Sequence, residues 1–323
     1  MNNKLLALLL SVILTSGLIY THPAFAHTFG DDESADWLAK MAEIKTEAGL
    51  VAKHIGDTNA ISYYSNTLGM YWNANDTMQM GERNTLLQTE IPSTINAVLS
   101  DAQAGNQSAV NDDVSKLNSY LDESIQVRVD PDKLNNSTIR ALAVVYVLKE
   151  ALGQYGKAIN SPTDLNDMSQ MNMSGGSSMS GMSGSSSSMS GSSSSMSGMS
   201  GMSSMPSTIV DQNAYENSVG LTTAAQSMFN DLTTNNQDKS SSNTKISTAF
   251  TKLMQDLSNK ADGNTVMMDV HMNIHPVIIT AYNLPSDTSA NAAVPEFPLP
   301  ALLVVVSIAG VVAVTRFRSQ LGF

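Results

Sequence analysis

The residues with the most distinctive chemistry are methionines gathered in one stretch, residues 168–206, which we call the Met-rich tract. Ten of the chain's 20 methionines lie there, and nearly everything between them is Ser or Gly. A thioether sulfur is a soft ligand that suits Cu(I) and is poor for Mg²⁺, Ca²⁺ or Mn²⁺. The tract therefore indicates copper binding, with these candidate ligands: Met179, Met182, Met196, Met199, Met202 and Met205. The alternative is a low-complexity repeat without chemistry, because Ser/Gly-rich sequence is typical of a disordered tether.

A second candidate group lies further along the chain, in residues 267–276. On an α-helix, positions i, i+3, i+4 and i+7 of this segment would share one face and present Met268, His271, Met272 and His275. Two imidazoles with two thioethers fit copper better than calcium or magnesium. Pro276 disfavours helical geometry at His275, so we expect a kink there or a new helix starting at Pro276. The alternative is a core face with two hydrogen-bonded histidines.

The N-terminus adds one further candidate ligand, His27. Residues 1–4 are a short basic region, residues 5–19 are apolar, and Ala24-Phe25-Ala26 is a small-x-small cleavage site. This pattern predicts a secretory signal peptide over residues 1–26 and a mature chain that begins at His27. A terminal histidine offers its α-amine and its imidazole to the same ion, which resembles the mature N-termini of secreted copper proteins. The alternative is an exposed terminus that frays and binds nothing.

The C-terminal end has the pattern of a sorting signal. Residues 294–300 read VPEFPLP, an apolar run follows over residues 301–315, and Arg316 and Arg318 close it. The run is near the minimum length for a membrane span, and the arginines place its end inside the cell. This tail resembles archaeal PEF-type sorting signals and looks closest to the PEFG-CTERM tails of surface proteins from ammonia-oxidising archaea, with Pro298 where that motif has Gly. The resemblance implies an extracellular protein anchored to the membrane by its C-terminus and recognised by a sorting enzyme.

Composition excludes several other classes. The chain has no Cys, so disulfides, thiolate zinc sites and iron–sulfur clusters are ruled out. A formal net charge of −12 with 17 Lys and Arg argues against nucleic-acid binding. The sequence also contains no HExxH, Gly-x-Ser-x-Gly or phosphate-binding glycine motif, so we expect no enzymatic activity.

The apolar periodicity that must position these ligands is helical. The first stripe recurs at threes and fours: Trp37, Met41, Ile44, Ala48 and Val51. The pattern predicts an all-α fold of about eight helices, with five in a block over residues 27–162 and three in a block over residues 208–285. Residues 163–207 are expected to be a disordered linker, residues 286–300 a Pro-containing linker, and residues 301–323 the tail. In detail, we expect helices over residues 59–78, 82–104 with a kink or break at Pro92, 137–159, 210–232, 246–257 and 265–284.

Together these features predict an extracellular, membrane-tethered metal-binding protein that captures or buffers copper and passes it to a copper-receiving protein. The alternative is a structural or adhesive cell-surface protein in which the Met-rich tract is a spacer. A minor alternative is an iron-uptake accessory protein, because a secreted helical chain with few histidines resembles imelysin-type proteins. Their Gly-x-His-x-x-Glu pattern is absent from this sequence.

Overall fold

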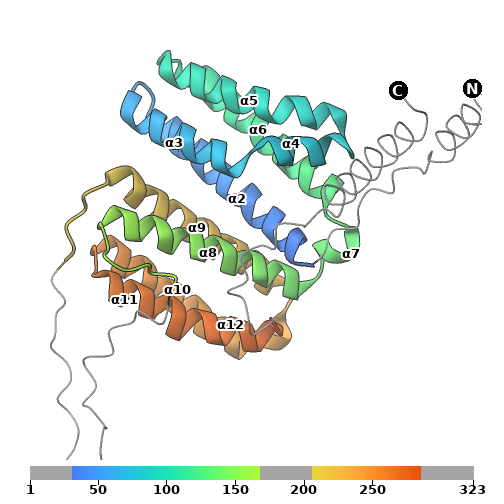
Figure 1. The fold of residues 1–323 in the computed structure, drawn as a ribbon. Helices are drawn as coiled ribbons and strands as arrows, with labels where there is room; N and C mark the ends of the chain where they lie inside the picture. The colour runs from blue at the N-terminus through green and yellow to red at the C-terminus, as the bar shows by residue number, and fades with distance from the viewer. Residues whose placement is uncertain (1–30, 168–205, 285–323) are drawn as a thin grey trace, which may run out of the picture. The chain divides into compact units, whose positions relative to one another are not determined.

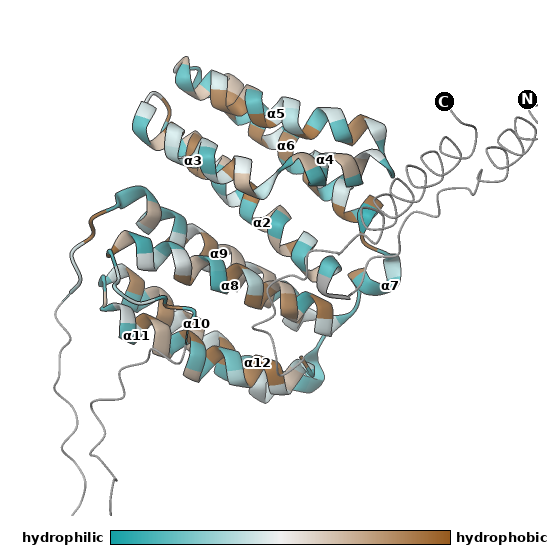
Figure 2. Cartoon of the chain, in the orientation of Figure 1, coloured by the Kyte–Doolittle hydropathy of each residue, from teal (hydrophilic) through white to brown (hydrophobic). Residues whose placement is uncertain are grey.

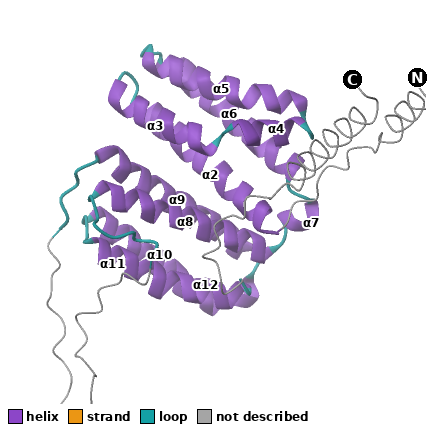
Figure 3. Cartoon of the chain, in the orientation of Figure 1, coloured by secondary structure: helices purple, strands orange, loops and turns teal. Residues whose placement is uncertain are grey.

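The computed structural model describes residues 31–167 and 206–284, and within these ranges the regular elements are all helical (Figure 3). The predicted all-α class is confirmed. Both predicted helical blocks lie in one compact unit. The elements are α2 (Asp31–Lys53), α3 (Thr58–Tyr71), α4 (Ala74–Gly81), α5 (Thr85–Gln103), α6 (Gln107–Arg128), α7 (Pro131–Leu134), α8 (Ser137–Ala158), α9 (Gln212–Thr234), a 3₁₀ turn (Gln237–Lys239), α10 (Ser240–Ser258), α11 (Gly263–Met268), a π-helical segment (Asp269–Ile274) and α12 (His275–Tyr282).

Helix α2 is the central element, because it packs against helices from both halves of the chain. It contacts α3, α5 and α6 on one side and α8 and α9 on the other (Figure 1). The predicted stripe is its first buried face, where Trp37, Met41 and Ile44 are fully buried against α3–α6. A second face carries Ala35 and Ala39 and packs into a separate core with α8 and α9. Alanines let the helices approach closely on this side.

The second core is built from both sides of the Met-rich tract. Helices α8 and α9 pack along each other, and α10, α11 and α12 cover them (Figure 1). These helices carry both brown apolar and teal polar residues along their length in Figure 2, and the apolar residues that are buried form one cluster. Phe229, Phe250 and Tyr282 form an aromatic group in this core, with ring centroids 5.8 Å apart for the two phenylalanines and 6.5 Å for Phe229 and Tyr282.

One predicted helix, residues 59–78, is two helices in the structure. Helix α3 ends at Tyr71, and Trp72 has an extended backbone. Asn73 then caps α4: its side chain accepts from the backbone of Asn75 and Asp76, while the Asp76 carboxylate accepts from the Asn73 N–H. Such a capping box satisfies amide groups that a helix start leaves open. Asp76 also accepts from Lys40 Nζ of α2 at 2.9 Å, which ties the break to the central helix.

Two other local expectations need correction. Pro92 does not break α5, which continues through it, with Ile91 and Ile95 on either side buried in the first core. The polar stretch expected between residues 233 and 243 already contains the start of α10, since Asn243 is buried and bonds on two sides. Its amide donates to the Asn236 carbonyl at 3.0 Å and its oxygen accepts from Tyr282 Oη at 2.8 Å.

The predicted signal peptide, Met-rich tract and C-terminal tail lie outside the described residues, apart from the tract's last residue, Pro206. Within residues 31–167 and 206–284, no helix combines the length and apolarity that crossing a bilayer requires.

Candidate metal centre

The segment that carries the two histidines is a π-helix between two α-helices. Pro276 has no N–H to donate to the Met272 carbonyl, and its ring crowds that carbonyl, so the preceding turn cannot be regular α-helix. The His275 N–H bonds instead to the Val270 carbonyl, five residues back. Helix α12 then starts at His275 without an intervening turn. The disturbance expected from Pro276 is therefore a widened turn, a form that is frequent at functional sites.

The widened turn changes which predicted ligands lie together. His271 is 7% exposed and His275 is half-buried, whereas Met268 and Met272 are 43% and 51% exposed. The expectation that all four side chains share one face was therefore wrong, since the wider turn rotates the thioethers toward solvent. The two imidazoles do meet: their ring centroids are 5.9 Å apart and their planes cross at 76°. With metal–imidazole bonds of about 2.0–2.1 Å, two rings on one ion have centroids roughly 5–6.5 Å apart, so this pair is correctly spaced.

A backbone carbonyl fixes the chemistry of the His271 ring. His271 Nε2 lies 3.0 Å from the Leu165 carbonyl oxygen, which can only accept, so Nε2 carries the proton. Nδ1 is then the unprotonated nitrogen, and it is buried without a hydrogen-bond partner among the described residues. A metal-bound histidine typically donates its other ring N–H to a carbonyl or carboxylate in this way. His271 therefore offers one oriented lone pair.

Leu165 reaches this position because a glycine makes room for it. Leu165 is 2% exposed and sits against Ile159 and Gly263. A Cβ on Gly263 would lie 3.1 Å from Leu165 Cδ2 and 3.0 Å from Ile159 Cδ1, so a larger residue there would push both side chains away. The predicted linker was placed to start at residue 163, but the structure describes residues 163–167 and buries Leu165 there. The predicted start is therefore too early. Leu165 was missed because it is a lone apolar residue in a polar stretch.

The electrostatic setting keeps both imidazoles neutral. Burial lowers the pKa of His271, which the bond to the Leu165 carbonyl opposes in part. Burial also lowers the pKa of His275, helped by His271 and by Lys149 of α8. Neutral imidazole is the form that binds metals. Within residues 31–167 and 206–284, no group of three or more His, Asp or Glu side chains is placed to hold a metal ion. The positive charge of Lys149 lies close enough to His275 to disfavour further positive charge there.

Both ends of the Met-rich tract attach to the body near this pair. On the outgoing side, Leu165 bonds His271 two residues before the described chain stops at Asp167. On the returning side, the Ser207 N–H donates to the Lys260 carbonyl at 2.6 Å, three residues before α11. Ser207 and Leu165 line one small pocket together with Met267. The other predicted ligands lie outside the described residues: His27, Met179, Met182, Met196, Met199, Met202 and Met205.

The comparisons with known proteins return nothing: no family model, no curated protein and no solved structure matches this chain. The fold and the site are thus the basis for inferring what it does.

Proposed function

We propose that this chain is a copper-binding protein of the cell surface, without enzymatic activity, whose fixed binding element is the imidazole pair His271 and His275. The observation that carries the proposal is the buried Nδ1 of His271, which has no partner in the described residues while Nε2 is bonded to a backbone carbonyl. Burying a polar atom without a partner costs free energy unless a ligand satisfies it.

Cu(I) is the ion that best suits these residues. Both imidazoles are neutral, and thioethers add no charge, so a monovalent ion keeps the site's total charge low beside Lys149. Imidazole binds Cu(I) and Zn²⁺ alike, but thioether ligands favour Cu(I). Met268 and Met272 stand close in sequence and are exposed, and the Met-rich tract starts next to Leu165.

The tract and the tail give the proposal its setting. Ten methionines between residues 168 and 206 would take up Cu(I) at low affinity and exchange it with the imidazole pair and with a copper-receiving protein. The signal-peptide pattern and the resemblance to PEF-type tails support an extracellular position, anchored by residues 301–323 and processed by a sorting enzyme. His27 at the mature terminus would be a further copper ligand.

An anaerobic Cu(I) titration against a chromophoric chelator tests this function. In the full chain, His271→Gln should raise the dissociation constant of the most tightly bound Cu(I) ion by about 10- to 100-fold. Changes around a metal site typically lower metal affinity by this factor. His54→Gln is the matched control, because His54 pairs with Glu216 at 2.8 Å on another face and should bind as the wild type does.

Two further variants separate the fixed site from the tract. Replacing the methionines between residues 168 and 206 by leucine should lower the number of weakly bound Cu(I) ions and leave the tight site in place. If His271→Gln and His275→Gln both retain the wild-type stoichiometry and affinity, the imidazole pair is a structural element and the chain belongs with structural or adhesive surface proteins.

A further inference from the structure

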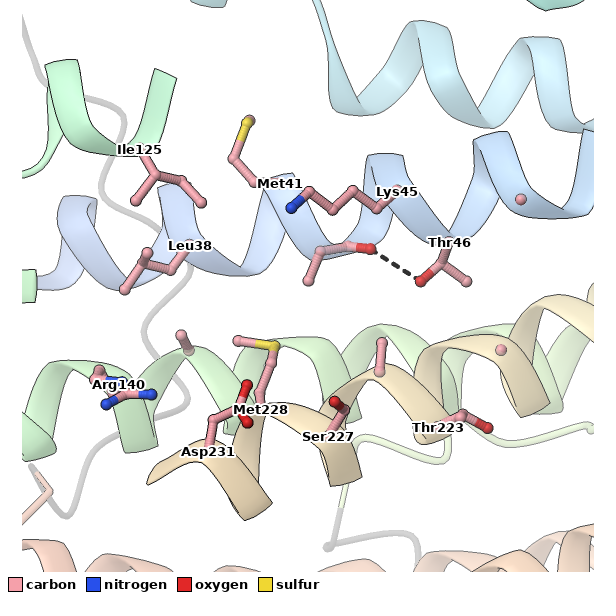
Figure 4. A pocket seen from close by; sticks show the side chains of 15 residues that line it. Leu38, Met41, Lys45, Thr46, Ile125, Arg140, Thr223, Ser227, Met228 and Asp231 are labelled. Carbon is pink, nitrogen blue, oxygen red and sulfur yellow. Dashed lines mark hydrogen bonds between the residues drawn. The ribbon is translucent and has the colours of Figure 1, made fainter. Parts of the chain in front are cut away.

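A groove of about 700 Å³ lies between α2 and α9, with α6 and α8 completing its walls (Figure 4). Its volume falls within the range of about 300–1,000 Å³ typical of small-molecule sites. Of the proposed copper ligands that the structure describes, none lines it: Met268, His271, Met272 and His275. The groove is therefore a separate feature of the molecule.

The groove exists because small side chains meet where four helices come together. Three alanines from three helices line it and leave its centre unfilled: Ala42, Ala143 and Ala224. Near one end α2 and α9 touch, since a Cβ on Gly220 would lie only 2.8 Å from Thr46 Cγ2. From there the lining continues along the same helices to Leu38 of α2 and Asp231 of α9.

The lining is mainly apolar and long in one direction. Leu38 of α2 and Met228 of α9 lie toward each other between the helices, and Ile125 of α6 adds to the wall (Figure 4). From Gly220 to Asp231 the groove follows α9 for eleven residue-to-residue steps, on the order of 16 Å of helix at 1.5 Å per step. A narrow, extended apolar ligand fits this shape better than a compact polar one.

Charged groups stand at the end away from Gly220. Arg140 of α8 is half-buried there and has neither a hydrogen bond nor an ion pair from its side chain among the described residues. Lys45 also lines the groove, but its ammonium group is paired with Asp122 at 2.5 Å. Asp231 is exposed, so water solvates its carboxylate. Of the two cations in the lining, Arg140 is therefore the one whose side chain makes no hydrogen bond or ion pair with a described residue, so it is the group that can receive an anionic head.

We propose that this groove binds a single-chain amphiphile with a carboxylate head. The hydrocarbon chain lies along Leu38, Ala224 and Met228, and the carboxylate accepts from the guanidinium of Arg140, whose planar fork matches it. Burial of the chain supplies most of the affinity, since apolar area removed from water is favourable.

Calorimetric titration of the copper-free full chain with dodecanoate, below its micelle concentration, tests the proposal, with dodecyltrimethylammonium as the cationic counterpart. We expect one saturable equivalent of dodecanoate and no saturable binding of the cation. Arg140→Gln should weaken dodecanoate binding by about tenfold, because it removes a charge-assisted hydrogen bond. Lys245→Gln, which removes an exposed cation on α10, should leave binding unchanged.

Filling the groove from opposite walls gives an independent test. Ala224→Leu and Ala42→Leu should each abolish binding, while Ala97→Leu on α5, outside the groove, should not. Melting temperatures of all variants show whether they fold, and Arg140→Gln decides the matter if a filled variant is unstable. The proposal is wrong if dodecanoate does not saturate, if the cation binds equally well, or if both filled variants still bind. It is also wrong if Ala224→Leu alters only self-association in sedimentation, because the groove would then receive a second copy of the chain.

Discussion

Among single residues, Glu47 has the least ordinary environment. It is fully buried at the middle of α2, and neither carboxylate oxygen meets hydrogen-bond geometry with a described residue. Asn217 of α9 faces it, and the Tyr64 and Tyr71 hydroxyl groups are also buried without partners in the described residues. Burial raises the pKa of Glu47 to about 8; the Asn217 amide opposes this, and the negative charge of Glu150 adds to it. Burial raises the pKa of Glu43 as well.

This raised pKa predicts a stability that falls with rising pH. Between its ordinary pKa of 4.5 and about 8, Glu47 holds a proton in the folded chain but loses it in the unfolded chain. The unfolded state then binds fewer protons, so the free energy of unfolding decreases through this window and levels off above it. Glu47→Gln keeps the shape without the charge and should stabilise the protein at pH 8 by about 2–4 kcal/mol while changing little at pH 4.

Urea unfolding at several pH values measures this effect. Glu82→Gln, at an exposed position, is the control and should follow the wild type. In Glu47→Gln the free energy of unfolding should still fall with rising pH, but less steeply, because the pKa of Glu43 is also raised in the folded chain. Parallel curves for the wild type and Glu47→Gln would show that Glu47 is ionised in the folded protein.

Among the elements, the turn between α10 and α11 decides where the imidazole pair sits. Gly263 leaves space for Leu165, and the Leu165 carbonyl orients the His271 ring. Tyr155 Oη donates to the Ala261 carbonyl at 2.5 Å, which ties the same turn to α8. The copper proposal therefore depends on Gly263, which lies several residues before either histidine in the sequence and makes room for Leu165.

Gly263→Ala should weaken the tight Cu(I) site even though it leaves both histidines in place. The added methyl group displaces Leu165 and its carbonyl, and loss of an orienting partner typically costs about 10-fold or more in metal affinity. Gly153→Ala in α8 is a matched control, since its Cβ would meet only Asn166 Nδ2 at an ordinary 3.7 Å. Replacing a mid-helix glycine by alanine should stabilise by about 0.5–1 kcal/mol and leave Cu(I) binding unchanged. Equal Cu(I) affinities in the two variants would contradict the role given to Leu165.

At the scale of the whole molecule, α2 joins two cores that otherwise share few residues. Its Trp37 face belongs to the core with α3–α6, and its Ala35 and Ala39 belong to the core with α8–α12. A substitution that destabilises one core should therefore destabilise the other through α2. We expect residues 31–167 and 206–284 to unfold together in a single transition.

Leu253→Ala tests this coupling, because Leu253 lies in α10, in the core without a tryptophan. The chain's two tryptophans, Trp37 and Trp72, lie together in the other core with ring centroids 5.7 Å apart. Loss of a buried leucine should cost about 2–5 kcal/mol, and tryptophan fluorescence and circular dichroism should report the same shifted midpoint. Thr251→Ala, exposed on α10, should shift neither. A fluorescence midpoint that stays at the wild-type value would mean that the two cores unfold separately.

The sequence was sufficient to predict the helical class because large apolar residues recur at helical spacing, as Trp37, Met41 and Ile44 do. It was insufficient for the second face of α2, since alanines such as Ala35 fit core and surface alike. The imidazole pair was predicted from His-x₃-His spacing, but the exposure of Met268 was not, because spacing assumes a regular α-helix and Pro276 widens the turn. Leu165 and Glu47 depend on contacts with residues about a hundred or more positions away, which no local pattern encodes.

The two-sided packing of α2 has a consequence for how the chain is made. A ribosome produces α2 first among the described helices, and the partners for its Trp37 face follow by residue 128. Its alanine face needs α9 as well as α8, and α9 begins only at residue 212, after the Met-rich tract. During synthesis, the alanine face of α2 can therefore pack on α8 but stays without α9 until residues 212–234 have been made. The risk that this exposed apolar surface leads to misfolding or aggregation therefore depends on how fast the last third of the chain is translated.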